Sequence, residues 1–159
     1  MKVCPFSEIE VKFVVSTVKL YENNSYIKTF DAIVLSCEEK DDAYFITLDK
    51  TAFFPEGGGQ YADKGKLADA NVLDVQIEDE IIYHLTDKPL NIGETVTGEI
   101  DWDTRFSRMQ NHTGEHIVSG VIHSLYGYNN VGFHLNDNIV TLDTDGPLNE
   151  QDIAKIELE

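Results

Sequence analysis

The spacing of apolar residues changes once along this chain, near residue 100, and that change limits the folds open to it. Before that point, short apolar runs alternate with turn signals such as Asn23-Asn24-Ser25. Short strands at such spacing are typical of a small barrel or sandwich. From residue 101 the apolar positions follow a helical period up to Tyr126, and Gly127 is a natural stop. The pattern predicts an α+β fold, a small N-terminal β-barrel followed by a helix on an antiparallel sheet.

Alternation and β-branched content predict strands over residues 11–21, 30–36, 44–48, 65–67, 72–78, 81–85, 95–100, 131–135 and 139–142. Asp101 or Asp103 can cap the long helix, and Asn149 can cap a last helix from Glu150 onward. We therefore expect two units, a β-barrel with a glycine-rich loop over residues 1–93 and an α+β unit over residues 94–159. The sequence ends inside the last helical pattern, so we expect the second unit to be truncated.

Composition limits the partners and the location. The net charge of −17, from 29 acidic and 12 basic residues, argues against non-specific binding to a polyanion. No apolar run is long enough for a transmembrane helix, and the first ten residues lack the apolar core of a signal peptide. Cys4 and Cys37 have no metal-type spacing, which favours reduced thiols. A cytoplasmic protein without membrane association is expected.

The long helix has a polar stripe and an apolar side. At about 100° per residue, the stripe consists of Arg105, Arg108, His112, His116, Ser119 and His123. The opposite side consists of Ile117, Val118, Val121, Ile122 and Leu125. We expect the apolar side to pack on a sheet and the stripe to face a cleft or solvent.

His112 and His116 are four positions apart on this stripe. Their Cβ atoms then lie about 6 Å apart on one face of the helix, and their ring nitrogens can converge on one ion at about 2.0–2.1 Å. Alone, the pair also fits two histidines on a polar surface. His123 lies about 10 Å further along the axis, because each residue adds about 1.5 Å, and cannot share that ion.

The segment Phe53–Gln60 contains three consecutive glycines, Gly57 to Gly59, directly after Pro55-Glu56. Glycines are favoured where φ is positive or where the backbone closely approaches another group. Pro55 prevents the strand from continuing as a central one. The segment is not a phosphate-binding loop, because the Gly-Lys-Ser/Thr ending and the following helix are absent. A wide hairpin loop and a loop that contacts another molecule both remain open.

Taken together, these motifs resemble the editing domain of alanyl-tRNA synthetase. The resemblance rests on residues 51–65, Asp101-Trp102, Arg105, Arg108-Met109 and His112-Thr113-Gly114-Glu115-His116, in that order. The closest likeness is to the free-standing alanyl-tRNA editing proteins of the long AlaX type, which residues 131–135 and 142–145 also fit. It covers roughly residues 26–159.

The resemblance implies a β-barrel followed by an α+β editing core, and hydrolysis of tRNA(Ala) mischarged with serine or glycine. It implies that His112 and His116 are zinc ligands and that Gln60 borders the catalytic pocket. In such a site, the backbone amides of Gly58 and Gly59 can stabilise an oxyanion, and Thr113 is a candidate substrate contact. The expected partner is therefore tRNA(Ala), while the oligomeric state is not indicated.

The chain departs from the family pattern in one respect. The family takes its other two zinc ligands from a later Cys-x-x-x-His, and no cysteine follows Cys37 here. A catalytic zinc normally has three protein ligands. We therefore expect the remaining ligands beyond Glu159, with zinc held weakly and hydrolysis weak or absent in this chain. The basic surface that tRNA binding requires is expected there too.

Two other functions are compatible with the sequence. An unrelated zinc hydrolase of the metalloprotease kind would place a glutamate directly after the first histidine, but Thr113 follows His112. Glu115 lies about 60° from the stripe and is a poor general base. A non-catalytic β-barrel that binds a protein partner fits the acidity and the missing ligands. Zinc content and ester hydrolysis separate the three.

Overall fold

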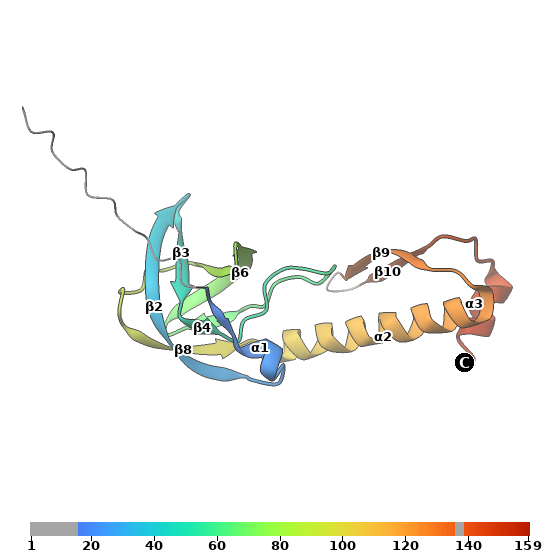
Figure 1. Cartoon of the computed structure of the whole chain (residues 1–159), viewed down its shortest axis with the longest axis horizontal. Helices are drawn as coiled ribbons and strands as arrows, with labels where there is room; N and C mark the ends of the chain where they lie inside the picture. Colours follow the sequence, from blue (N-terminus) through green and yellow to red (C-terminus); the bar gives the residue numbers. More distant parts are fainter. Residues whose placement is uncertain (1–15, 136–138) are drawn as a thin grey trace, which may run out of the picture.

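The computed structural model describes residues 16–135 and 139–159, and its fold is mixed α+β, which confirms the predicted class (Figure 1). The strands are β1 (Val18–Lys19), β2 (Thr29–Lys40), β3 (Ala43–Leu48), β4 (Lys50–Thr51), β5 (Gly65–Leu67), β6 (Ala70–Glu78), β7 (Ile81–Thr86), β8 (Thr95–Ile100), β9 (Asn130–Leu135) and β10 (Val140–Thr144). The helices are α1 (Leu20–Asn23), α2 (Trp102–Tyr126) and α3 (Glu150–Ile156). No helix in these described ranges is long and apolar enough to cross a membrane.

Six antiparallel strands pair in the order β2-β3-β7-β6-β5-β8, and β8 pairs again with β2, so the sheet closes on itself as a barrel. The expected division at residue 93 was therefore wrong. It assigned residues 95–100 to the second unit, whereas these residues hydrogen-bond to β2 and β5 on either side. A boundary drawn at the turn residues Pro89, Asn91 and Gly93 misses such a strand, because its partners lie far back in the sequence.

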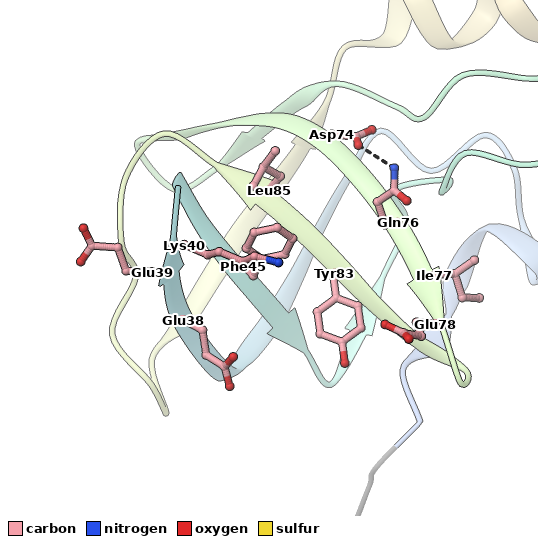
Figure 2. Close-up of a pocket in the computed structure, with 10 residues that line it drawn as sticks. All are labelled: Glu38, Glu39, Lys40, Phe45, Asp74, Gln76, Ile77, Glu78, Tyr83 and Leu85. Carbon is pink, nitrogen blue, oxygen red and sulfur yellow. Dashed lines mark hydrogen bonds between the residues drawn. The ribbon is translucent and has the colours of Figure 1, made fainter. Parts of the chain in front are cut away.

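Alternate residues of the barrel strands fill its interior, as the period of two requires. Outward-facing positions include Phe45, Tyr83 and Leu85 on β3 and β7 (Figure 2). Inside, Phe53 is fully buried and meets the Phe30 ring edge-on, with ring centroids 5.7 Å apart. Phe53 opens the glycine-rich segment, so the base of that segment is anchored in the barrel core.

The strand expected over residues 11–21 lies partly outside the described residues. Val18 and Lys19 form a short parallel pair with β4, but Leu20 and Tyr21 begin the single turn α1. The prediction was wrong for these two residues. Both pack against the barrel core, which consecutive side chains of a strand cannot do because they point to opposite faces.

Helix α2 begins and ends where the sequence predicts. The Asp101 carboxylate accepts a hydrogen bond from the Thr104 amide at 3.3 Å, and Gly127 closes the helix with φ of 74°. The apolar side is covered only in part. Ile122 is buried, but Ile117 and Val118 are 63% and 42% exposed. The expected packing of that whole side on a sheet was therefore wrong.

The second half of α2 packs against the hairpin β9–β10 and against α3 (Figure 1). The hairpin confirms the predicted pair of strands, while the turn expected at residues 136–138 lies outside the described residues. Asn149 caps α3 in a reciprocal capping box with Asp152, as predicted for that helix start. Asn130, the first residue of β9, donates to Glu115, so the hairpin lies beside that side of α2 and leaves Ile117 open.

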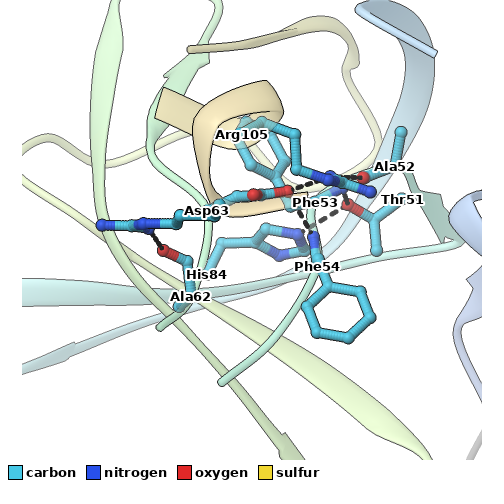
Figure 3. A network of polar contacts seen from close by, with 9 residues as sticks. Thr51, Ala52, Phe53, Phe54, Ala62, Asp63, His84 and Arg105 are labelled. Atoms are coloured by element: carbon cyan, nitrogen blue, oxygen red, sulfur yellow. Dashed lines mark hydrogen bonds and ion pairs between the residues drawn. The ribbon is translucent and has the colours of Figure 1, made fainter. Parts of the chain in front are cut away.

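His84 is an entirely buried polar residue of the barrel core. Its Nδ1 lies 3.1 Å from the Ile46 carbonyl oxygen, which can only accept, so Nδ1 donates and Nε2 accepts from the Thr51 hydroxyl at 2.8 Å (Figure 3). Thr51 Oγ1 in turn accepts from the Phe53 amide at 3.1 Å. Burial lowers the pKa of His84 from 6.5 to about 4. This neutral imidazole fixes the start of the glycine-rich segment.

The low pKa of His84 predicts that the folded protein loses stability as the pH falls. The unfolded chain takes up a proton at about pH 6.5, but the folded chain does so only near pH 4. Stability is therefore fully present above pH 6.5 and falls between these values, by about 3 kcal/mol for His84 alone. Urea unfolding from pH 7 to pH 4 should give a smaller decline for His84→Gln than for the wild type, with exposed His123→Gln as control. Equal declines in all three proteins would contradict this role.

Candidate functional site

Residues 52–63 leave the barrel as a hairpin that runs along α2 towards β9 (Figure 1). At its tip, Gly57 and Gln60 exchange two backbone hydrogen bonds of 3.1 and 3.0 Å. The two residues between them, Gly58 and Gly59, have φ of 59° and 79°. Positive φ at both central positions is the signature of a type I′ turn. We call residues 52–63 the glycine hairpin; its tip is tight, not a wide loop.

Gly59 is also the point where the glycine hairpin meets β9. Its carbonyl oxygen accepts from the Leu135 amide at 3.2 Å. A Cβ at this position would lie 2.7 Å from Phe133 Cδ1 and 2.8 Å from the Phe133 carbonyl oxygen. Only glycine fits here, because both the space and the φ exclude a side chain.

A buried ion pair joins the base of the glycine hairpin to α2. The Asp63 and Arg105 side chains are 0% and 3% exposed, and Arg105 Nη1 donates to Asp63 Oδ2 (Figure 3). The same oxygen accepts from the Phe54 amide at 2.7 Å, and Arg105 also reaches the Ala52 carbonyl oxygen at 3.4 Å. Burial raises the pKa of Asp63, while the adjacent Arg105 guanidinium opposes that shift. Arg105 thus holds both arms of the hairpin.

Arg108 makes the next contact along the helix. It donates to the Ala62 carbonyl oxygen at 2.6 Å, and its guanidinium lies 5.7 Å from the centre of the Tyr61 ring. Both arginines were expected to face a cleft or solvent, but both are buried. For Arg105 this was wrong, whereas Arg108 lines a cavity of about 450 Å³. Helical spacing places them on the stripe correctly, but it does not reveal which segment packs there.

The buried ion pair predicts that the substitution Asp63→Asn strongly lowers the free energy of unfolding. Asp63→Asn leaves the buried Arg105 guanidinium without its counter-charge, which costs about 3–5 kcal/mol. The free energy of unfolding in urea should fall by that amount. Asp69→Asn removes the same charge from an exposed pair with Lys88 and should have little effect. Equal losses in the two variants would show that the Asp63 pair does not stabilise the hairpin.

The tip of the glycine hairpin places Gln60 against His112. The Gln60 side chain is buried, and its Oε1 lies 3.0 Å from His112 Nδ1. Since an amide oxygen only accepts, Nδ1 donates, and Nε2 keeps its lone pair. The His112 ring also lies 5.3 Å from the Phe133 ring, between centroids. The two motifs therefore meet, as their proposed common site requires.

The His116 ring lies beside its neighbour in sequence, Glu115. Its Nδ1 lies 3.1 Å from Glu115 Oε2. Glu115 is buried, and its other oxygen accepts from Asn130 Nδ2 at 2.6 Å and from the Ser119 hydroxyl. The centroids of the His112 and His116 rings are 4.9 Å apart, which confirms that the two rings share one face of α2.

Both histidines thus have Nδ1 beside an oxygen atom, and among the described residues neither Nε2 atom has a hydrogen-bond or ion-pair partner. Metal-binding histidines typically have this arrangement, because the second contact sets the tautomer and the ring orientation. Among residues 16–135 and 139–159, no group of three or more His, Cys, Asp or Glu side chains is placed to hold an ion. The candidate site in these ranges therefore consists of two imidazole nitrogens.

The remaining predicted residues lie around this pair. A cavity of about 260 Å³ beside the tip is lined by Glu56, Gly57, Gly59, Gln60, Tyr61, His134 and Leu135. Gln60 therefore borders a cavity as well as His112. Gly58 is exposed at the tip, and Thr113 is exposed on α2. Sequence reasoning overlooked Glu115 as an anchor of His116, although its place directly before that histidine was the available signal.

Sequence comparison gives a consistent picture. A family model described as tRNA synthetases class II (A) matches residues 10–104. The alanyl-tRNA editing protein AlaX-L of Pyrococcus horikoshii is 33% identical over 149 residues, which cover 89% of this chain and 37% of that protein. An alanyl-tRNA editing protein of Mus musculus is 32% identical over 152 residues, 87% of this chain and 37% of its own length. This chain belongs to the AlaX-type editing family.

The editing domains of complete synthetases are similar as well. The alanine–tRNA ligase of Ignicoccus hospitalis is 39% identical over 115 residues, which are 70% of this chain and 12% of the ligase. The chain thus spans little more than a third of the free-standing editing proteins and about an eighth of the ligase. The predicted family resemblance is confirmed.

Proposed function

We propose that this editing domain acts in the hydrolysis of tRNA(Ala) mischarged with serine or glycine. The observation that carries the proposal is the 3.0 Å contact between Gln60 and His112, which joins two motifs 52 positions apart at one point. A pocket selective for alanine rejects serine poorly, since one added hydroxyl is a small change, and a second hydrolytic site corrects the error. The names of the relatives support tRNA(Ala) as the partner.

His112 and His116 are the residues that would hold a zinc ion, through their Nε2 atoms. Bound zinc polarises a carbonyl group and lowers the pKa of a bound water. Imidazole nitrogens suit this ion, but catalytic zinc sites use three protein ligands, and the described residues offer two. We therefore propose that this chain alone binds zinc weakly.

The other residues would orient the substrate. Gln60 fixes the tautomer of His112, and the nearby Glu115 carboxylate would orient the His116 ring. The Gly58 and Gly59 amides lie at the tip of the glycine hairpin, where they could donate to the developing oxyanion of the ester. Thr113 follows His112 on an exposed turn of α2, within reach of a substrate that approaches the pair from that side.

Zinc binding tests the histidine pair. His112→Ala and His116→Ala should each weaken zinc binding about tenfold or more, because each removes one of two donors. The measurement is competition with a chromophoric chelator at pH 7.5. His123→Ala is the matched control, since His123 is an exposed histidine on the same helix whose Nδ1 contacts the Tyr128 carbonyl oxygen. If His123→Ala loses as much zinc affinity as His112→Ala and His116→Ala, or if these two variants lose none, the proposed zinc site is wrong.

Ester hydrolysis tests the site as a whole. Gln60→Ala should slow the release of labelled serine or glycine from mischarged tRNA(Ala) about 10- to 100-fold, because it frees the His112 ring. Gln151→Ala on α3 provides the control, and folding of each variant is checked by circular dichroism. If the wild-type chain neither releases the amino acid nor binds zinc, a role as a non-catalytic binding module is favoured instead.

A further inference from the structure

The outer face of the barrel carries a groove that plays no part in the proposed editing site. Its volume is about 760 Å³, and it shares no lining residue with the cavity beside the glycine hairpin. Its floor is Phe45, Tyr83 and Leu85, and its rims carry Glu38, Asp74 and Glu78 (Figure 2). We call these six residues the acidic groove.

Strand register explains how the floor and the rims come together. Glu38 pairs with Phe45, Phe45 with Leu85, and Leu85 with Asp74, so these residues form one row across β2, β3, β7 and β6. Directly paired residues point to the same face of a sheet. The row therefore has two apolar side chains in the middle and a carboxylate at each end. Three strand spacings of about 4.8 Å separate its ends by about 14 Å along the sheet, a width that admits one extended peptide.

The next row extends the same surface. Tyr83 pairs with Gln76, and Glu78, two residues further along β6, is the diagonal neighbour of Tyr83 on the same face. Figure 2 shows the Tyr83 ring and the Glu78 carboxylate on this side of the barrel. Tyr83 is half-buried and Glu78 is exposed, so the aromatic floor again lies beside a carboxylate.

The carboxylates of the acidic groove have few partners of their own. Glu38 and Glu78 have no ion-pair or hydrogen-bond partner among the described residues, and Asp74 accepts from Gln76 Nε2 at 2.7 Å. Phe45 in the floor already makes a cation–π contact, because Lys40 Nζ lies 5.7 Å from the centre of its ring. Aromatic rings next to unpaired carboxylates form a surface complementary to lysine and arginine.

We propose that the acidic groove binds an extended, basic segment of another protein, in which Lys or Arg alternates with apolar residues. The apolar side chains would cover Leu85 and Phe45, and the cations would reach Glu38, Asp74 and Glu78. Nucleic acid is repelled here by the carboxylates. A second copy of this chain is disfavoured as well, because each copy carries a net charge of −17.

The test uses the full 159-residue chain and a blocked peptide of alternating Lys and Leu, about seven residues or roughly 23 Å long when extended. Titration is followed by amide chemical shifts. Shifts should concentrate at Phe45, Tyr83 and Leu85, and a peptide with Glu in place of Lys should cause none. The double variant Glu38→Gln/Glu78→Gln should bind the Lys peptide about fivefold more weakly, as expected for two partly exposed ion pairs.

The matched control is Glu99→Gln/Glu157→Gln, which changes the net charge equally at exposed positions outside the groove. Its affinity for the Lys peptide should stay at the wild-type value. Equal weakening in both double variants would overturn the proposal in favour of diffuse attraction to an acidic protein. Shifts of the groove residues with an RNA oligonucleotide, or with protein concentration alone, would overturn it in favour of nucleic acid or of self-association. None of these outcomes depends on the editing activity.

Discussion

The ion pair between Asp63 and Arg105 is almost entirely buried, and the geometry of the proposed editing site depends on it. A buried pair of this kind adds little net stability compared with apolar residues, but losing one partner is costly. Its main effect is on alignment. Asp63 and Gln60 are three residues apart in an extended arm, which is about 10 Å. Arg105 and His112 are seven residues apart in a helix, which is also about 10 Å. Once the pair forms, Gln60 is therefore level with His112.

The site that results is organised by acceptors rather than by charge. Gln60 accepts a hydrogen bond from Nδ1 of His112, and a Glu115 carboxylate oxygen lies 3.1 Å from Nδ1 of His116. Both of these oxygen-bearing side chains are buried, while the His116 side chain is 71% exposed. The Nδ1 atoms of the two rings therefore lie beside buried oxygen atoms. Such preorganisation reduces the conformational entropy lost when a ligand binds. The contact between Gln60 and His112 also explains why the two motifs occur together. Neither the histidine motif nor the glycine motif can form this contact alone.

Local signals predicted the parts of the fold that local interactions determine. Asp101, Gly127 and Asn149 mark helix ends through contacts within four residues, and all three were predicted. Strand pairing and burial were harder, because both depend on distant segments. The spacing that placed Arg105 on the polar stripe was right, yet its burial follows from the glycine hairpin, 42 positions earlier at Asp63. The exposure of Ile117 likewise depends on where a later hairpin packs.

The distribution of charge bears on how a nucleic acid could approach. Arg105 and Arg108 hold the glycine hairpin and are buried, so neither is available to phosphates. Asp63 and Glu115 are buried too, so the exposed surface keeps the strongly acidic balance of the composition. The carboxylates of the acidic groove add to this repulsion on the outer face of the barrel. The free Nε2 atoms of His112 and His116 instead lie beside the tip of the glycine hairpin, where Gly58 and Gly59 present backbone. The acceptor end of the proposed substrate would therefore meet the molecule on that side.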